Sequence, residues 1–399
     1  MTSEQLTLVH PDRRTHRQAI IDLTGKTFGH TYWDWLVHCR RSYVDRGPYD
    51  WSASTVGFLG DEIVTHWGVW RIPMRIGRAV VRVGGIGAVS THGEMRKRGL
   101  MAQTATASIE AMRREGYDLS LLFGISDFYP RFGYVRAWAD NRYVAQVRDL
   151  PTGRLPGRLR RIAPRHRDDL ARLYNRTHAS LTGTAVRPTY LQHDNHWQGY
   201  AWSDTAGQMA GYVFAFSRWG HFGVYDSAGP ADDVLRAVAR IARRAGEKEV
   251  RFESLHEDSD LARRLRAGNC RAERGYHRCG GPMVRTIHLA STLGKLRGEL
   301  SRRLRRSHLA GWRGRLLIAD SHERVVLAIH RGKVSVAENE RTAPHGLRGG
   351  DAIAQLLLGT DDPHETAAAG GIRLRGDGRR LLGVLFPSQH PQLGPWDHF

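Results

Sequence analysis

The spacing of apolar residues changes several times along the first 150 residues. Apolar side chains recur every three or four residues over 17–28 and 32–44, which predicts two amphipathic helices. The period then becomes two, which predicts strands of an antiparallel meander at 55–59, 63–76 and 80–89. The other elements expected in this part are a helix over 99–114, a strand over 119–123, a short helix and a strand over 134–147.

A similar order of elements returns later in the chain, after a break in the fold that the composition indicates. Residues 151–161 hold two prolines and two glycines between basic residues, which is typical of a linker. Beyond it the pattern predicts a helix over 161–177, strands over 207–217 and 221–226, a helix over 232–244 and a strand over 250–254. In both parts a helix ending in Arg-Arg-x-Gly precedes a strand, a helix and an aromatic Gly-Tyr turn. The sequence therefore predicts an internal duplication, with an insertion in the second copy.

A third part begins near Ile287 with a basic amphipathic helix. The predicted fold class is α/β (α+β), with two mixed-sheet units over 1–150 and 151–286 and a small α+β domain over 287–399. The elements expected in the third part are a helix over 293–306, strands over 314–319, 324–329 and 333–336, helices near 351–358 and 364–369, and a strand over 381–385.

The chain of 399 residues has a formal net charge of +20. Such a charge attracts polyanions, so nucleic acid or a phosphate-rich cofactor becomes a candidate partner. The basic residues of 236–306 follow helical spacing, however, and no aromatic or glycine-rich RNA-binding signature lies among them. We therefore expect most of them on solvated helix faces and do not expect nucleic acid as the partner.

Cysteines and apolar runs are both sparse. The three cysteines, Cys39, Cys270 and Cys279, are too few and too scattered for a disulfide framework or a zinc site, so we expect no metal and a reducing compartment. The first 17 residues lack the apolar centre of a signal peptide, and no run of 18 apolar residues occurs. These features predict a cytoplasmic protein that does not span a membrane.

A basic, glycine-containing loop separates a predicted strand from a helix of small and apolar residues. The loop reads Arg96-Lys97-Arg98-Gly99-Leu100-Met101-Ala102. A helix start offers unpaired main-chain N–H groups and the positive end of the helix dipole, which together hold phosphate without a metal. Arg and Gly near a helix end are also common without a ligand. The other phosphate motifs, Gly-x-x-x-x-Gly-Lys-Ser/Thr and Gly-x-Gly-x-x-Gly, do not occur in a strand–helix context.

This loop, the strand before it and the downstream Tyr129-Pro130-Arg131-Phe132-Gly133-Tyr134 together resemble the acetyl-CoA-dependent N-acetyltransferases of the GNAT superfamily. The three-part layout is most similar to the Eis (enhanced intracellular survival) group. That resemblance implies two tandem GNAT-like units, a sterol-carrier-like C-terminal domain, acetyl-CoA as co-substrate and transfer of an acetyl group to a primary amine. It also implies a homo-oligomer, with a hexamer as one candidate state.

The resemblance assigns the cofactor to three stretches of the first unit. Pantetheine would follow the main chain after the strand, the pyrophosphate would lie on the loop amides, and two residues after the next strand would flank the cofactor. The cofactor-binding candidates are Val89, Ser90, Thr91, Lys97, Arg98, Gly99, Leu100, Met101, Ala102, Gly124 and Ile125. The corresponding loop of the second unit, 229–233, contains a proline and two acids and should not bind the cofactor.

Tyr129 takes the position of the general acid in that family. A phenol with a pKa of about 10 can protonate the departing thiolate, and an ordinary core tyrosine is the alternative. The general base of Eis-like enzymes is the carboxyl-terminal carboxylate, which corresponds to Phe399. Asp127 is the rival base or amine anchor, and Trp396 and Phe399 could instead only dock the tail.

The acceptor is left open among aminoglycosides, polyamines and lysine side chains. Candidate substrate-binding residues are Trp33, Asp34, Trp35 and Asp127, because aromatic faces and carboxylates attract amines. We expect direct attack without a covalent enzyme intermediate. The alternatives are a non-catalytic polyanion- or nucleic-acid-binding protein built on degenerate units, and a lipid carrier in which the third domain does the work.

Overall fold

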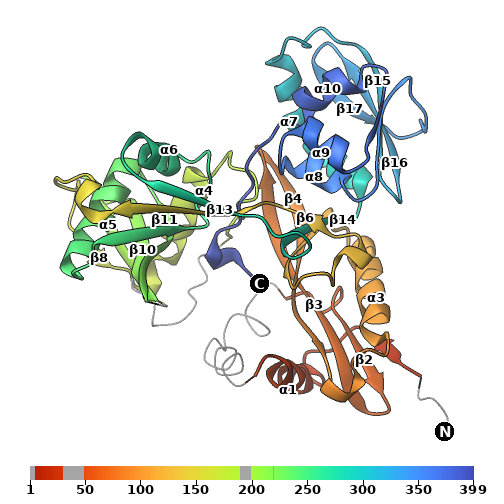
Figure 1. The fold of residues 1–399 in the computed structure, drawn as a ribbon, viewed down its shortest axis with the longest axis horizontal. Coiled ribbons are helices and arrows are strands. Elements are labelled where there is room, and N and C mark those ends of the chain that lie inside the picture. Colours follow the sequence, from red (N-terminus) through yellow and green to blue (C-terminus); the bar gives the residue numbers. More distant parts are fainter. Residues whose placement is uncertain (1–4, 30–48, 189–198, 219) are drawn as a thin grey trace.

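Three β-sheets organise the chain into three lobes, as Figure 1 shows. The computed structural model describes residues 5–29, 49–188, 199–218 and 220–399. Each sheet is covered by helices, so the predicted α/β (α+β) fold class is confirmed. The helix predicted over 32–44 lies outside the described residues.

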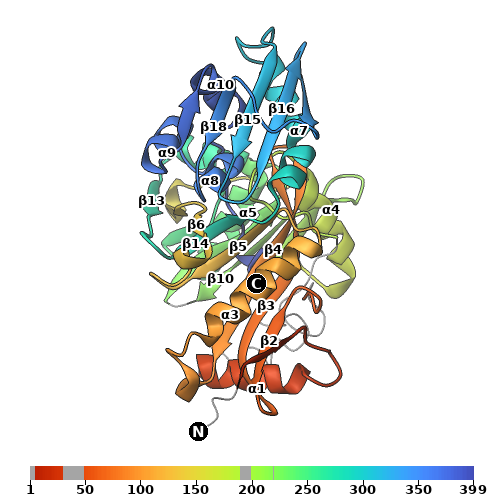
Figure 2. The same ribbon diagram turned by 90° about the vertical axis from the view of Figure 1, so that its right-hand side faces the viewer.

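The first lobe is a mixed sheet built around the hairpin of β3 and β4. These strands pair from Ile76↔Ala79 at the turn to Thr65↔Thr91 at the far end. Helices α1 (Arg17–Phe28) and α3 (Leu100–Arg114) pack on this sheet, and Figure 2 shows α3 lying across it. The strands in spatial order are β1 (Thr7–Val9), β2 (Thr55–Leu59), β3 (Glu62–Ile76), β4 (Ala79–Thr91), β5 (Leu119–Gly124), β14 (Gly281–Thr286) and β6 (Val135–Arg136).

The second lobe repeats this order of strands and helices. An antiparallel meander leads into a helix, α5 (Ala231–Arg244), which connects two parallel strands as α3 does in the first lobe. The helices α4 (Arg167–Thr177) and α6 (Asp260–Ala267) complete it. The strands in spatial order are β13 (Arg271–Gly275), β7 (Asp140–Gln146), β12 (Glu249–Glu253), β11 (His221–Ala228), β10 (Met209–Arg218), β9 (Gly199–Ser203) and β8 (Arg160–Arg161).

The two lobes exchange a strand. The single strand predicted over 134–147 is wrong, because the chain breaks after Arg136 and leaves the first sheet. Its first part, β6, pairs with β14 in the first sheet, while its second part, β7, is inserted between β12 and β13 in the second. In return β14, from the far end of the second unit, pairs with β5. The sheets therefore do not follow the expected division at residue 150.

The third lobe shares a core with the first. Helix α7 (Leu289–Arg305) packs against both β4 and β17, and its fully buried leucines recur every three to four residues. The segment 381–385, expected as a strand, lies in helix α10 (Gly378–Leu385), because Leu381, Leu382 and Leu385 share one helical face. The other elements are β17 (Lys333–Ala337), β16 (Arg324–His330), β15 (Gly314–Ala319), β18 (His345–Arg348), β19 (Arg373–Arg375), α8 (Ile353–Leu358) and α9 (Pro363–Ala369).

The carboxyl-terminal segment 386–399 leaves the third lobe after α10. It runs down between the other two lobes, where the end marked C lies in Figure 1. Its one regular element is the short 3₁₀ turn η5 (Pro395–Asp397). The end of the chain is thereby brought to the first lobe, about 300 residues away in sequence from the strands it meets.

Candidate functional site

A cavity of about 710 Å³ opens where β4 and β5 cease to pair. The two strands are parallel neighbours from Val83↔Leu119 to Ile86↔Leu122, and β4 then continues to Thr91. Residues of β4 beyond the last pair line one wall, and residues that follow β5 line the opposite wall. Ligands of open α/β sheets bind at the carboxyl ends of such diverging strands.

A strained position shapes the β4 wall. Ala88 has φ of 50°, and the register between β3 and β4 shifts here. Its carbonyl oxygen accepts a hydrogen bond from His66 Nδ1 at 2.8 Å, so His66 Nε2 accepts from the Tyr49 hydroxyl at 2.9 Å. Burial lowers the pKa of His66 to about 4, so the ring that supports the bulge is neutral at pH 7.

The basic loop closes one end of the cavity. Gly99 has φ of 77° and is the N-cap of α3, a conformation that favours glycine. No side chain caps this helix, and its first turn holds no acid. The Ala102 N–H donates to the Gly99 carbonyl at 3.1 Å, whereas the N–H groups of Leu100 and Met101 have no partner among the described residues. Free amides, the helix dipole and exposed Lys97 together give this end of the cavity a positive electrostatic character.

Most of the predicted cofactor residues lie together in this cavity. Ser90, Ala102 and Gly124 do not line it: Ser90 is buried, and its hydroxyl donates to the Ala88 carbonyl at 3.1 Å. Gly124 lies beneath Tyr129, whose ring a Cβ at this position would strike. The predicted residues that line the cavity are Val89, Thr91, Lys97, Arg98, Gly99, Leu100, Met101 and Ile125.

Tyr129 lines the same cavity from the turn after β5. Its ring packs edge-on against Trp67 and Phe128, with centroids 5.9 and 4.9 Å away. Burial raises the pKa of Tyr129 to about 12, so its hydroxyl stays protonated at every pH at which the protein would be assayed. The neighbouring Tyr134 is fully buried and shares a hydrogen bond of 2.7 Å with the Ser120 hydroxyl, which is a packing role.

Phe399 enters the cavity from the side of β4. Its ring lies against Gly85, where a Cβ would collide with it, and its carboxyl carbon lies 3.0 Å from the position of a Cβ at Gly87. The ring also packs against Trp70 and lies 5.6 Å from the Phe123 ring centroid. The structure thus places the Phe399 carboxyl group and Tyr129 in one cavity with the basic loop.

Sequence reasoning missed the glycines that make room for the tail. Gly85 and Gly87 interrupt a largely apolar strand. Glycine within a strand often marks the close approach of another segment, which is the signal that could have identified them. Phe123, which also lines the cavity, carries no such signal.

The substrate-binding candidates are only partly placed. Asp127 is exposed, has φ of 62° and does not line the cavity, and its N–H donates to the Cys279 carbonyl at 2.9 Å. Trp33, Asp34 and Trp35 lie outside the described residues. Trp67 and Trp70, in contrast, belong to the core of the first lobe.

The equivalent opening in the second lobe is occupied by the tail. A small hollow of about 50 Å³ between β11 and β12 is lined by Gln392, Gly394 and Pro395. Helix α5 begins after Pro230, and the acids of its first turn pair with arginines, Asp232 with Arg264 at 2.6 Å. Proline and carboxylates at this helix start oppose phosphate binding.

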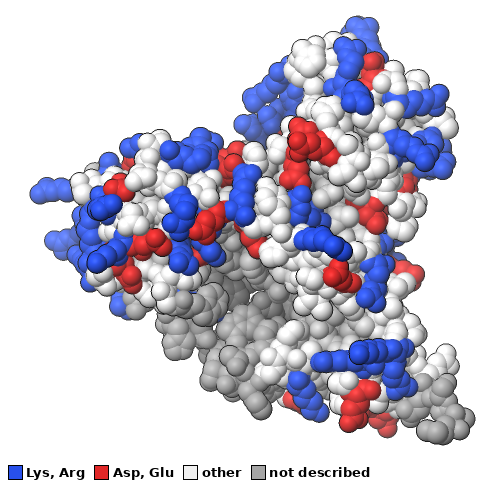
Figure 3. Space-filling view, in the orientation of Figure 1, with Lys and Arg blue, Asp and Glu red and all other residues white. Residues whose placement is uncertain are grey.

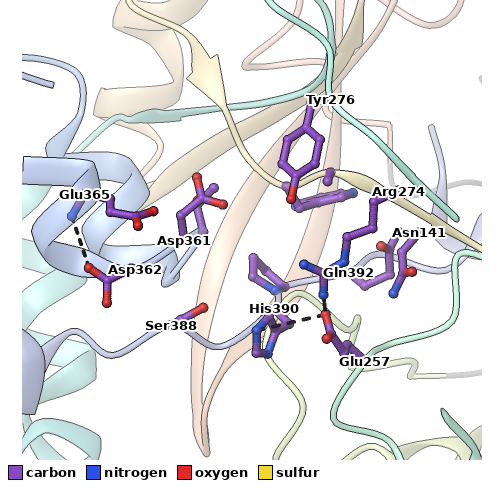
Figure 4. Close-up of a pocket in the computed structure, with 14 residues that line it drawn as sticks. Asn141, Glu257, Arg274, Tyr276, Asp361, Asp362, Glu365, Ser388, His390 and Gln392 are labelled. Carbon is purple, nitrogen blue, oxygen red and sulfur yellow. Dashed lines mark hydrogen bonds and ion pairs between the residues drawn. The ribbon is translucent and has the colours of Figure 1, made fainter. Parts of the chain in front are cut away.

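A second cavity, of about 220 Å³, lies where the three lobes meet and is shown in Figure 4. Two of its four acidic residues form ion pairs, Glu257 with Arg274 and Asp361 with Arg136. The tail residue His390 borders it and hydrogen-bonds Asp258 at 3.2 Å. This cavity therefore lies along the path of the tail. In the part of the chain that the structure describes, no three His, Cys, Asp or Glu side chains gather as metal ligands.

Comparisons with known proteins agree with this geometry. Residues 9–137 match the acetyltransferase (GNAT) domain, and the match ends one residue after β6, where the chain leaves the first sheet. No curated protein matches the chain significantly. No described helix has the length and apolar character needed to cross a membrane.

Solved structures share the fold over nearly the whole chain. A GCN5-related N-acetyltransferase from Kribbella flavida is 20% identical, with a TM-score of 0.73 over 99% of this chain and 98% of its own. One from Anabaena variabilis is 14% identical, with a TM-score of 0.76 over 99% and 100%. Eis1 from Mycobacterium abscessus is 16% identical, with a TM-score of 0.69 over 99% and 100%. The domain match and the shared fold support acetyl transfer as the general class of reaction.

Proposed function

We propose that the protein is an acetyl-CoA-dependent N-acetyltransferase that modifies a primary amine, on a small molecule or a lysine side chain. One observation carries the proposal: the basic helix start, Tyr129 and Phe399, whose carboxyl carbon lies beside Gly87 of the cavity wall, all line one cavity at the diverging ends of β4 and β5. The exposed charges of the loop suit a phosphate-bearing donor, while the interior suits an uncharged acetyl thioester.

The residues present fit acetyl-CoA. The unpaired amides of Leu100 and Met101 and the side chains of Lys97 and Arg98 would hold the pyrophosphate. The β4 wall at Val89 would receive the pantetheine arm beside the gap between the strands. The bound co-substrate supplies the acetyl thioester.

Tyr129 is the general acid in this proposal. Attack of the neutral amine on the thioester carbonyl forms a C–N bond and breaks the C–S bond. The leaving thiolate takes the phenol proton, and the proton that the nitrogen loses on becoming an amide returns to the phenolate through solvent. Because the pKa of Tyr129 is raised to about 12, the phenol holds its proton until the thiolate develops.

The Phe399 carboxylate is the general base. An alkylammonium must lose a proton before it can attack, and a carboxylate inside the cavity can accept it directly or through water. Asp127 is the weaker candidate, because it lies outside the lining of the cavity. Lone-pair attack by the freed amine then needs no covalent enzyme intermediate.

A panel of amines with acetyl-CoA, read as release of CoA thiol, tests the proposal. We expect turnover with at least one amine, and Tyr129→Phe should lower kcat about a hundredfold without weakening acetyl-CoA binding. Tyr134→Phe is the matched control from the same aromatic turn and should retain most of kcat. A chain extended by two glycines beyond Phe399 should bind acetyl-CoA but lose turnover, because its carboxylate is displaced.

The rival polyanion-binding function would show a different result. It requires a concentrated basic surface, whereas Figure 3 shows Lys and Arg spread over the three lobes and interspersed with acids on the face drawn. Salt-sensitive binding of nucleic acid with no thiol release from any amine would favour it and overturn the enzyme.

A further inference from the structure

The carboxyl-terminal segment is held mainly by the second lobe, although the cavity it enters belongs to the first. Trp396 packs in the core of the second lobe, with its ring 5.2 Å from that of Phe214. Three residues later the Phe399 carboxyl group lies against Gly87 of β4. The last ion-paired residue before the cavity is Asp397.

Asp397 forms an ion pair with the buried Arg187, and we call this pair the clamp. Arg187 Nε lies 2.8 Å from Asp397 Oδ1 and Arg187 Nη2 lies 2.8 Å from Asp397 Oδ2, with side chains 6% and 10% exposed. The Tyr174 hydroxyl donates to Asp397 Oδ2 at 3.2 Å, and the Tyr174 ring lies 3.5 Å under the guanidinium. A bidentate pair fixes both the distance and the orientation of the carboxylate.

Arg187 is itself fixed to both lobes. Its Nη1 lies 2.8 Å from Asp226 Oδ2 on β11. Its N–H donates to Asn175 Oδ1 at 3.0 Å, and its carbonyl accepts from Asn175 Nδ2 at 2.7 Å. The same Asn175 Oδ1 accepts from Arg75 Nη2 of β3 at 3.0 Å. Hydrogen bonds through Asn175 and Arg187 therefore connect Arg75 of the first sheet to Asp397 of the tail.

We infer that Arg187 is a positioning residue for the Phe399 carboxyl group, an inference that rests on the proposed function. Between the clamp and the carboxyl group the chain has only His398, whose ring lies 4.0 Å from that of Phe123. A base displaced by about 1 Å can lower a rate by about a hundredfold. The start of α5 in the second lobe is unsuited to phosphate binding. The second lobe would instead contribute to the reaction by orienting the Phe399 carboxylate in the cavity of the first lobe.

Variants of the clamp test the inference by kcat and by its pH dependence. Asp397→Asn and Arg187→Gln should each lower kcat at least tenfold with KM for acetyl-CoA within twofold, and the double variant should be no slower than the slower single one. Arg187→Lys, which keeps the charge but not the bidentate geometry, should restore part of kcat. In the wild type kcat should level off with pH once the carboxylate is ionised, whereas in Asp397→Asn it should keep rising about tenfold per pH unit.

Arg236→Gln is the matched control, because Arg236 forms an Arg–Asp pair of 2.8 Å on α5 with Asp233. It should keep wild-type kcat and pH profile. Loss of folded protein alone would lower the rate by the same factor at every pH. A pH profile of kcat that is unchanged in Asp397→Asn therefore overturns the inference. A folded Asp397→Asn variant with full kcat also overturns it. If the extended chain is inactive while Asp397→Asn is fully active, only this inference fails. Full activity of the extended chain would overturn the proposed base as well.

Discussion

Gly85 and Gly87 have no side chain where Phe399 lies against β4. The ring of Phe399 fills the place of a Cβ at Gly85, and its carboxyl group borders that of Gly87. Both glycines lie in β4, where a side chain would otherwise be favoured. Their lack of a side chain therefore serves the tail and not the strand.

Gly85→Ala should displace the tail without unfolding the lobe. We expect kcat to fall at least tenfold while acetyl-CoA binding stays within twofold, because the new methyl group collides only with the Phe399 ring. Gly93→Ala is the control, since nothing lies within 4 Å of a Cβ there. Steady-state kinetics and calorimetric binding check both, and a Gly85→Ala enzyme with wild-type kcat would contradict the assignment.

His66 links the stability of the first lobe to pH. Its pKa is lowered to about 4 by burial, against about 6.5 when unfolded, so the unfolded chain binds more protons between these values. The stability it contributes is complete above pH 6.5 and is lost as the pH falls toward 4, by about 1.4 kcal/mol per pH unit. Urea unfolding of His66→Phe should show a shallower decline over this window than the wild type, and equal slopes would refute the role.

Several of these residues could be found from the sequence, and others could not. The basic loop was singled out because a helix start and its charges lie together in the chain, and Tyr129 because the turn around it resembles that of the GNAT superfamily. Arg187 lies about 210 residues from Asp397, and nothing in its neighbourhood announces that partner. A contact between distant segments is decided by the fold.

At the scale of elements, periodicity predicted the type of most helices and strands but not their neighbours. The helix at 17–28 and the strand at 55–59 have the expected bounds. The strand predicted over 134–147 was wrong because the apolar pattern of a segment does not report which sheet each part of it joins, and β6 and β7 lie in two different sheets. The strand predicted over 381–385 was wrong because a short apolar run has no distinctive period, and the segment is helical in α10.

Strand exchange predicts that the first 150 residues do not fold alone. Such a fragment lacks β14, whose Met283 and Val284 are buried between β5 and β6, and it exposes β7. We expect it to be insoluble when expressed alone and soluble when co-expressed with 151–399, as judged by gel filtration. A monomeric, cooperatively melting 1–150 fragment would contradict this prediction.

At the scale of the molecule, α7 joins the first and third lobes through one apolar core. Leu300→Ala on this helix should cost about 3 kcal/mol, because Leu300 is fully buried. Hydrogen exchange should then accelerate in both β4 and β17, since both strands pack against this helix. Faster exchange confined to β17 would show that the two lobes unfold independently.

The exchanged strands also set an order of events during synthesis. Domains usually fold one after another as they leave the ribosome, the N-terminal one first. Here the sheet that is translated first keeps an open edge at β5 until residues 281–286 emerge, by which time the second sheet has already recruited β7. The sheet of the first lobe is therefore completed late, when β14 pairs with β5. Until then, for most of the time that synthesis takes, the exposed edge of β5 must not pair with strands of other chains.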